Sequence, residues 1–111
     1  YGHPAGDHVL VEFCQRIQVK LRDSDAFGRW GGEEFLIVLP HCDIAAGKSL
    51  AEKLRSCIAC QPFSEVGMVT ASFGVAQRQR REDQLVWIQR ADQHLYIAKN
   101  GGRNRVVTAD R

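Results

Sequence analysis

Hydrophobic residues recur at helical spacing in three segments of this 111-residue chain and gather in short runs between them. The first predicted helix begins at Gly6-Asp7, with Asp7 as its N-cap, and its apolar positions are Leu10, Phe13, Cys14, Ile17 and Leu21. The second follows Asp43, and its apolar face comprises Leu50, Ala51, Leu54, Cys57 and Ile58. The third begins at Asp83 or Gln84, ends at Gly101-Gly102, and carries Leu85, Ile88, Ala91, Leu95 and Ala98.

Short apolar runs between these helices predict strands. Residues 26–30 and 33–39 flank Gly31-Gly32, which favours a β-hairpin, and Pro40 ends its second strand. Residues 68–76 and 105–107 predict two further strands. The resulting order, helix-strand-strand-helix-strand-helix-strand, is typical of an α+β domain whose helices pack on one sheet.

The composition is typical of one globular domain, and the charge balance bears on which partners the chain binds. Hydrophobic residues make up 44% of the chain and charged residues 25%, which excludes wholesale disorder. Fifteen basic residues against thirteen acidic ones give a net charge of +2, too balanced to indicate nucleic-acid binding. The one dense basic run is predicted to be a solvated loop, since Arg78, Arg80 and Arg81 stand among Gln and Glu.

The four cysteines include one Cys-x-x-Cys pair, Cys57 and Cys60. No second pair of this kind accompanies it, and Cys57 falls on the apolar stripe of its predicted helix. These features favour reduced thiols in a cytoplasmic protein over a metal site or a disulfide. A longer parent protein would still be able to reach a membrane through an upstream anchor.

The segment Gly31-Gly-Glu-Glu-Phe35 carries the candidate chemistry. A Gly-Gly turn exposes backbone N–H groups without Cβ atoms, so that a phosphate can approach closely. Glu33 and Glu34 alternate to opposite faces of the strand, which excludes a side-by-side dyad. One carboxylate beside such a turn suits Mg²⁺, which binds through one or two carboxylates plus substrate phosphates. A hairpin with two solvated acids is the alternative.

This segment resembles the GG(D/E)EF signature of the GGDEF family, the diguanylate cyclases. Four further motifs match in the same order: residues 2–7 resemble GHxxGD, 72–75 S(I/F)GV, 91–99 ADxALYxAK, and 99–105 KxxGRNR. The resemblance covers residues 2 to about 107. It implies a palm-like, ferredoxin-like sheet related to that of nucleotidyl cyclases, and the condensation of two GTP into cyclic di-GMP with release of pyrophosphate.

The resemblance also implies roles for the residues of the hairpin. Glu33 would be a ligand of Mg²⁺ or Mn²⁺ and would help to activate the attacking hydroxyl. Glu34 would support the end of the strand or the metal site. Gly31 and Gly32 would let the turn lie against the α-phosphate and the ribose.

Three further residues match motifs outside the hairpin. Asp7 would accept hydrogen bonds from guanine, with the N-cap as its alternative role. Lys99 and Arg103 would contact the terminal phosphates of GTP. Their alternative role is to complement the negative end of a helix dipole.

Arg22-Asp-Ser-Asp25 is similar to the family's product-inhibition motif, RxxD, which ends five residues before the signature. Arg22 would bind the O6/N7 edge of guanine in cyclic di-GMP, and Asp25 would bind the N1/N2 edge. Residues 80–83 also read RxxD but lack this position. The family often adds an arginine from the following helix. Lys53 occupies that position here and cannot form the same fork.

The family's domain begins with a strand and a helix that carry DxDxFKxxND, including a second metal ligand. Residues 1–111 do not include this segment, so the resemblance implies an N-terminally truncated GGDEF domain. Such a fragment is expected to be inactive alone and to leave two sheet edges unpaired, because the absent strand is a central one.

The expected partners are GTP, cyclic di-GMP and a second copy of the chain, with sensory or phosphodiesterase domains in a longer parent. Two alternatives are a degenerate module that acts as a cyclic di-GMP receptor and a dimerising regulatory domain. The intact signature, with Lys99 and Arg103, argues against decay. A domain that only dimerises would not need the Arg22–Asp25 pair.

Overall fold

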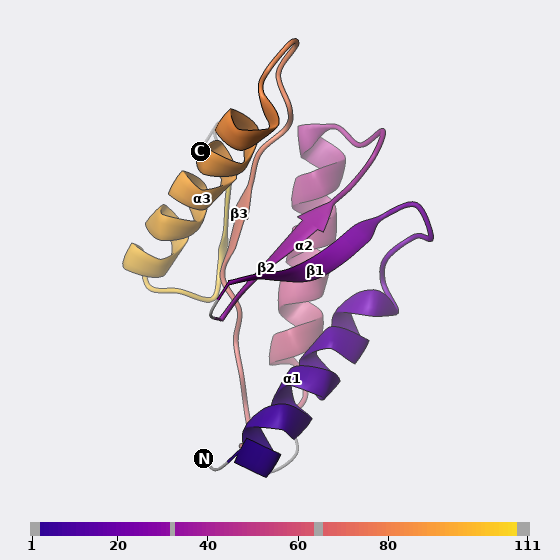
Figure 1. Ribbon diagram of the computed structural model, residues 1–111. Helices are drawn as coiled ribbons and strands as arrows, with labels where there is room; N and C mark the ends of the chain where they lie inside the picture. Colours follow the sequence, from indigo (N-terminus) through magenta and orange to yellow (C-terminus); the bar gives the residue numbers. More distant parts are fainter. Residues whose placement is uncertain (1–2, 32, 64–65, 109–111) are drawn as a thin grey trace.

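The computed structural model describes residues 3–31, 33–63 and 66–108. Its elements are α1 (His3–Gln18), β1 (Ala26–Gly31), β2 (Glu34–Val38), α2 (Ile44–Ala59), β3 (Phe73–Val75), α3 (Gln84–Asn100) and β4 (Val106–Thr108) (Figure 1). This order confirms the predicted α+β class. Within these three ranges, no helix combines the length and the apolar character that crossing a membrane requires.

Helix α1 begins earlier than the sequence pattern predicts. It starts at His3, so Asp7 lies inside the helix and the N-cap prediction for Asp7 is wrong. Pro4 is compatible with this start, because the first turn of a helix does not need the N–H that proline lacks. The predicted apolar stripe is confirmed at Ile17, which is 2% exposed.

Helices α2 and α3 each have an aspartate as N-cap, which confirms the prediction for Asp43 and, of the two predicted starts of α3, places the first helical residue at Gln84. Oδ1 of Asp43 accepts a hydrogen bond from the backbone N–H of Ala46 at 2.9 Å, and Oδ1 of Asp83 accepts one from Leu85 at 2.9 Å. Each N-cap thereby satisfies a donor that the first helical turn leaves free. Leu85, one of the apolar positions of α3, does not reach the core. Its side chain is 59% exposed, because position 85 is turned well away from the buried Ala98 around the helix.

The strands pair as two separate two-stranded sheets instead of the single sheet predicted. The predicted hairpin is confirmed: β1 and β2 are antiparallel, whereas β3 and β4 are parallel. Of the strand predicted over residues 68–76, only Phe73–Val75 forms, and its partner among the described residues is the equally short β4. Within the described ranges, β2 and β3 each have a strand partner along one edge only.

Both sheets cover one hydrophobic core. Its buried residues come from α1, α2 and the segment that follows α2, and they are Ile17, Leu54, Ile58 and Phe63. Partly buried residues of the hairpin and of β3 pack against this cluster, among them Phe27, Ile37 and Phe73. The helices therefore hold the two sheets together through side chains of this core.

A glycine permits the close approach of α3 to β3. A Cβ atom on Gly74 would lie 2.2 Å from the carbonyl oxygen of Ala91 and 2.2 Å from the backbone nitrogen of Leu95. No real Cβ atom is found so close to backbone atoms, so only glycine fits. This contact sets the position of α3, whose C-terminal end reaches the hairpin.

Arg16 of α1 forms hydrogen bonds with the C-terminal end of α2 and the residues that follow it. Its guanidinium donates hydrogen bonds to the backbone carbonyls of Ile58, Gln61 and Pro62 at 2.9–3.0 Å. The same guanidinium lies 3.7 Å from the centroid of the Phe63 ring. These carbonyls have no partners within a helix, and Arg16 satisfies them from a neighbouring element.

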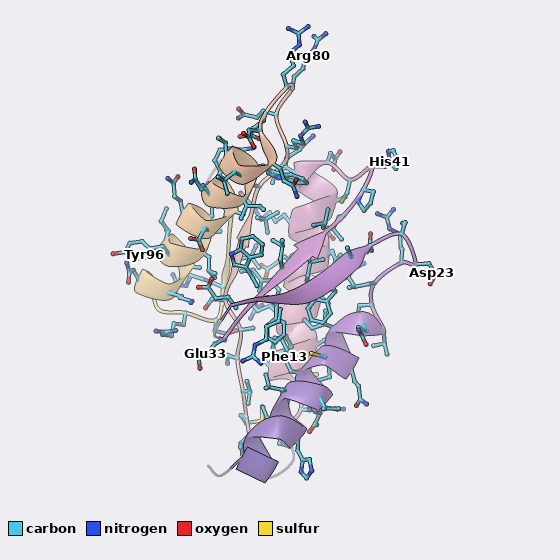
Figure 2. All side chains as sticks on the ribbon, in the orientation of Figure 1. Phe13, Asp23, Glu33, His41, Arg80 and Tyr96 are labelled. Carbon is cyan, nitrogen blue, oxygen red and sulfur yellow. The ribbon has the colours of Figure 1, made fainter. Side chains whose placement is uncertain are left out.

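Two charged tips project from the body of the molecule. Figure 2 shows Glu33 at the tip of the β1–β2 hairpin and Arg80 at the tip of the loop between β3 and α3. Arg78, Arg80 and Arg81 are all exposed, which confirms the prediction of a solvated loop.

Candidate functional site

The β1–β2 hairpin ends in a turn with free space around its backbone. Gly31 ends β1 and pairs with Glu34, and the register of the hairpin shifts between Arg29 and Gly31. A Cβ atom on Gly31 would meet nothing within 4 Å. The described part of the turn is therefore open to a ligand that needs close contact with the backbone.

The two glutamates of the turn have different surroundings. Glu34 is partly buried, and its Oε2 lies 3.3 Å from Nζ of Lys99. Glu33 is exposed in the turn and has no ion-pair partner among the described residues. One carboxylate is thus held by α3, while the other faces solvent.

The Lys99–Glu34 ion pair joins the hairpin to the C-terminal end of α3, and Figure 1 shows the hairpin turn near the loop that follows α3. Gly102 follows the helix with a φ of 118°, and the N–H of Arg103 donates to the carbonyl of Ala98 at 3.0 Å. This is a Schellman arrangement, which commonly closes a helix. Arg103 is exposed, four residues beyond Lys99.

Two residues predicted for the site have side chains or positions that the structure does not describe. Asp7 lies in α1, but its side chain is outside the described part of the chain. Gly32 lies between two of the described ranges. Their roles therefore stay predictions.

Arg22 and Asp25 lie in the turn between α1 and β1 and pair with each other. Nη2 of Arg22 donates to Oδ1 of Asp25 at 2.9 Å and to the carbonyl of Pro40 at 2.9 Å. The hydrogen bonds from the Arg22 side chain lower the pKa of Asp25. The Asp25 side chain is 2% exposed and that of Arg22 is 57% exposed. Arg22 therefore faces solvent, while it covers the carboxylate of Asp25.

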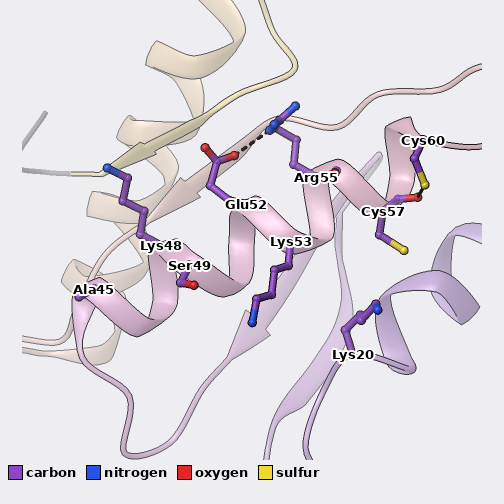
Figure 3. Close-up of a pocket in the computed structure, with 10 residues that line it drawn as sticks. Lys20, Ala45, Lys48, Ser49, Glu52, Lys53, Arg55, Cys57 and Cys60 are labelled. Carbon is purple, nitrogen blue, oxygen red and sulfur yellow. Dashed lines mark hydrogen bonds and ion pairs between the residues drawn. The ribbon is translucent and has the colours of Figure 1, made fainter.

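Lys53, the third residue predicted for the inhibitory site, lies on the exposed face of α2. It lines an open groove of about 920 Å³ together with other basic residues, Lys20, Lys48 and Arg55 (Figure 3). The free thiols Cys57 and Cys60 also line this groove. The Arg22–Asp25 pair is not part of its wall.

The donors at the hairpin fit a hard divalent cation. Within the described ranges, no group of three or more His, Cys, Asp or Glu side chains is arranged to hold a metal ion. Glu33 and Glu34 nevertheless supply carboxylate oxygens, and Mg²⁺ needs only one or two of these when phosphates complete its coordination. The hairpin therefore has the chemistry of a partial Mg²⁺ or Mn²⁺ site.

Comparison with known proteins decides the family. The family model for "Diguanylate cyclase, GGDEF domain" matches residues 1–105. The chain belongs to the GGDEF family. As a GGDEF sequence it is 40% identical over 112 residues to diguanylate cyclase DgcP from Pseudomonas aeruginosa, an alignment that covers 98% of this chain and 17% of DgcP.

Solved GGDEF domains share the fold. The active GGEEF domain of a diguanylate cyclase from Vibrio cholerae superposes with a TM-score of 0.88 at 36% identity, covering 97% of this chain and 70% of that one. The GGDEF domain of DgcB from Caulobacter crescentus, solved in complex with c-di-GMP, gives a TM-score of 0.93 at 30% identity. That match covers 100% of this chain and 68% of the DgcB chain.

Long-range contacts of this GGDEF domain are not predicted by its motifs. Glu34 and Lys99 each match a motif, but their pairing joins residues that are 65 positions apart. Arg55 of α2 hydrogen-bonds Asn104 across 49 positions, and only Asn104 belongs to a motif. Arg55 lies in an ordinary amphipathic helix, so no local signal distinguishes it from a solvated arginine.

Proposed function

We propose that the natural protein containing this chain is a diguanylate cyclase. The observation that carries the proposal is an open GGEEF turn beside the Lys99-bearing end of α3 in a GGDEF-family chain. In the reaction, the 3′-hydroxyl of each GTP attacks the α-phosphate of the other, and the bond to the β-phosphate oxygen breaks. Two phosphodiester bonds form, two pyrophosphate ions leave, and the product is cyclic di-GMP. Since each GTP needs its own site, we expect two copies of the domain to face each other.

The hairpin would supply the metal ligand and the close backbone contacts. Mg²⁺ or Mn²⁺ held by Glu33 would neutralise phosphate charge and favour ionisation of the attacking hydroxyl. The turn at Gly31 and Gly32 would let backbone N–H groups approach the α-phosphate without Cβ atoms between them. Glu34 would hold the ammonium group of Lys99 beside the turn.

Residues outside the hairpin would bind the two ends of GTP. Lys99 and Arg103 would attract the β- and γ-phosphates and stabilise the charge that develops on the leaving pyrophosphate. Asp7 would accept hydrogen bonds from N1–H and N2–H₂ of guanine, a pair of donors that adenine lacks. This contact would select GTP over ATP.

Cyclic di-GMP would bind at Arg22 and Asp25 and inhibit the enzyme. The exposed guanidinium of Arg22 is suited to the O6 and N7 acceptors of guanine. Asp25 would take the N1/N2 edge only after Arg22 turns away, because Arg22 covers its carboxylate. Lys53 would add one positive charge from α2. If the protein only binds the dinucleotide, it is a receptor or a dimerising regulatory domain.

The 111 residues alone are expected to lack cyclase activity, because the resemblance places a second metal ligand in an upstream segment. We therefore expect GTP turnover in the natural protein, which would act in the cytoplasm. Sensory or phosphodiesterase domains would be part of the same chain. Activity of the isolated 111 residues would contradict this part of the proposal.

The substitution Glu33→Ala in the natural protein tests the proposal. Pyrophosphate release from GTP with Mg²⁺ should fall by at least about 100-fold. Stability to urea should change by less than about 0.5 kcal/mol, since Glu33 is exposed. Asp23→Ala removes another exposed carboxylate and should keep full activity. Unchanged turnover in Glu33→Ala would reject the role of Glu33.

A further inference from the structure

The turn after α3 has an unusual backbone. Three consecutive residues have positive φ angles: Gly102 at 118°, Arg103 at 63° and Asn104 at 46°. Glycine adopts such angles freely and asparagine tolerates them, but arginine rarely does. Residues in this region persist when their surroundings hold them there, and they cluster at ligand-binding sites.

Contacts from two other segments hold this turn. Nη1 of Arg55 in α2 donates to Oδ1 of Asn104 at 3.0 Å. The backbone N–H of Asn104 donates to Oγ of Ser72 at 3.1 Å, just before β3. Asn104 is thus fixed through both its side chain and its backbone.

Arg55 is itself held in place. Its Nε donates to Oε1 of Glu52 at 2.7 Å, as Figure 3 shows, and its side chain is 27% exposed. With Nε on Glu52 and Nη1 on Asn104, the guanidinium has a fixed plane and direction. Arg55 therefore differs from Lys48 and Lys53, which line the same groove and for which the structure gives no ion pair among the described residues.

Within the described part of the chain, the backbone of Arg103 is held by hydrogen bonds, whereas its side chain is not. Its backbone N–H donates a hydrogen bond to the carbonyl of Ala98, and its carbonyl accepts one from Nε of Arg105 at 3.1 Å. Its guanidinium is exposed and has no hydrogen bond or ion pair among the described residues. A fixed backbone with an available guanidinium group suits the binding of an anion, because less conformational entropy of the protein is lost on binding.

We infer that Arg55 is a positioning residue for the nucleotide site. Together with Ser72 and Asn104, it holds the turn that presents Arg103 to the terminal phosphates of GTP. This inference rests on the proposed function, because it takes Arg103 to be a phosphate ligand. Arg55 would act through Asn104 and not by contact with the nucleotide, since its Nε and Nη1 serve Glu52 and Asn104.

A double-mutant cycle in the natural protein tests the inference. The probe is guanosine 5′-(α,β-methylene)triphosphate, which cannot release pyrophosphate, and its affinity is measured by calorimetry with Mg²⁺ present. Arg103→Ala should weaken binding by roughly 10- to 150-fold, the range for a lost charged hydrogen bond. Arg55→Gln should weaken it by roughly 2- to 10-fold. Added to Arg103→Ala, the Arg55→Gln change should have no further effect.

Three companion measurements separate positioning from general loss of stability. GMP lacks the terminal phosphates, so its affinity should be the same with Arg55 or Gln at this position. Lys48→Gln removes a positive charge from the same helix and should leave both affinities unchanged. If Arg55→Gln does not fold, Asn104→Asp, which keeps the acceptor for Arg55, should retain affinity that Asn104→Ala loses.

Two results would overturn the inference. One is an equal loss from Arg55→Gln in the presence and absence of Arg103, which would make Arg55 merely structural. The other is unchanged analogue binding in Arg103→Ala, which would remove the phosphate contact that Arg55 is meant to support. The cyclase proposal is judged separately, by turnover in Glu33→Ala.

Discussion

Nζ of Lys99 lies 3.3 Å from Oε2 of Glu34 and joins the last turn of α3 to the first residue of β2. Both side chains are 36% exposed, so water screens the pair. Ion pairs this exposed contribute about 0–1 kcal/mol to stability. The contact therefore orients an ammonium group beside the GGEEF turn more than it stabilises the fold.

Substitution of each partner separates these two roles. Glu34→Gln and Lys99→Met should each change the free energy of unfolding by less than about 1 kcal/mol in urea. Lys99→Met should also weaken binding of the methylene GTP analogue by roughly 10- to 150-fold, because methionine cannot bind phosphate. Lys48→Met, on α2, should bind normally. If Lys99→Met bound the analogue as tightly as the wild type, Lys99 would not contact the phosphates.

Product binding is expected to depend on Arg22. Arg22→Ala should weaken the affinity for cyclic di-GMP by roughly 10- to 150-fold, since it removes a charged, forked contact with guanine. Arg80→Ala alters the other RxxD string, whose arginine projects from an exposed loop, and should have little effect (Figure 2). Calorimetric titration compares the three proteins. Equal affinities of the wild type and Arg22→Ala would remove the inhibitory-site assignment.

Gly74→Ala should destabilise the fold by about 3 kcal/mol, because its Cβ atom would overlap the backbone of α3 at Ala91 and Leu95. Gly28→Ala is the matched control, since a Cβ there meets nothing within 4 Å. That variant should stay within about 0.5 kcal/mol of the wild type. Urea denaturation measures both. Similar stabilities of the two variants would show that α3 does not approach β3 as described.

Acid should weaken the loop that precedes α3. Hydrogen bonds from the Arg90 side chain, and then one from the backbone N–H of Gln79, lower the pKa of Glu82 from its usual 4.5 to about 2. Because the folded-state pKa is the lower one, the stabilisation is complete above about pH 4.5 and is lost as the pH falls towards 2.

The variant Glu82→Gln isolates this effect. Its stability should lie furthest below that of the wild type near neutral pH, and the difference should shrink as the pH falls through the interval between the two pKa values. Urea midpoints measured across this interval provide the comparison. A difference that stays constant with pH would contradict the assignment.

Local signals in the sequence predicted the elements well. Asp43 is the N-cap of α2, as the sequence predicts, because capping depends on a few adjacent residues. Helix α3 begins at Gln84, one of its two predicted starting residues. The hairpin followed from Gly31-Gly32 between two apolar runs. The start of α1 was missed, since the resemblance to GHxxGD says nothing of backbone conformation and Asp7 matches an N-cap equally well.

Non-local contacts could not be predicted in the same way. The division into two sheets depends on which strand edges meet, and residues far apart in the chain decide that. Arg16 satisfies carbonyls at the end of α2 more than forty positions away, yet in the sequence it is one more helical arginine. The same holds for Arg55 and its bond to Asn104.

Identification of the product that the natural protein makes from GTP tests the central claim most directly. With Mg²⁺ present, mass spectrometry should detect cyclic di-GMP, together with two pyrophosphate ions for each molecule formed, and Glu33→Ala should form neither. If the wild type binds cyclic di-GMP but leaves GTP unchanged, the protein is a receptor and the assignment as a cyclase is wrong.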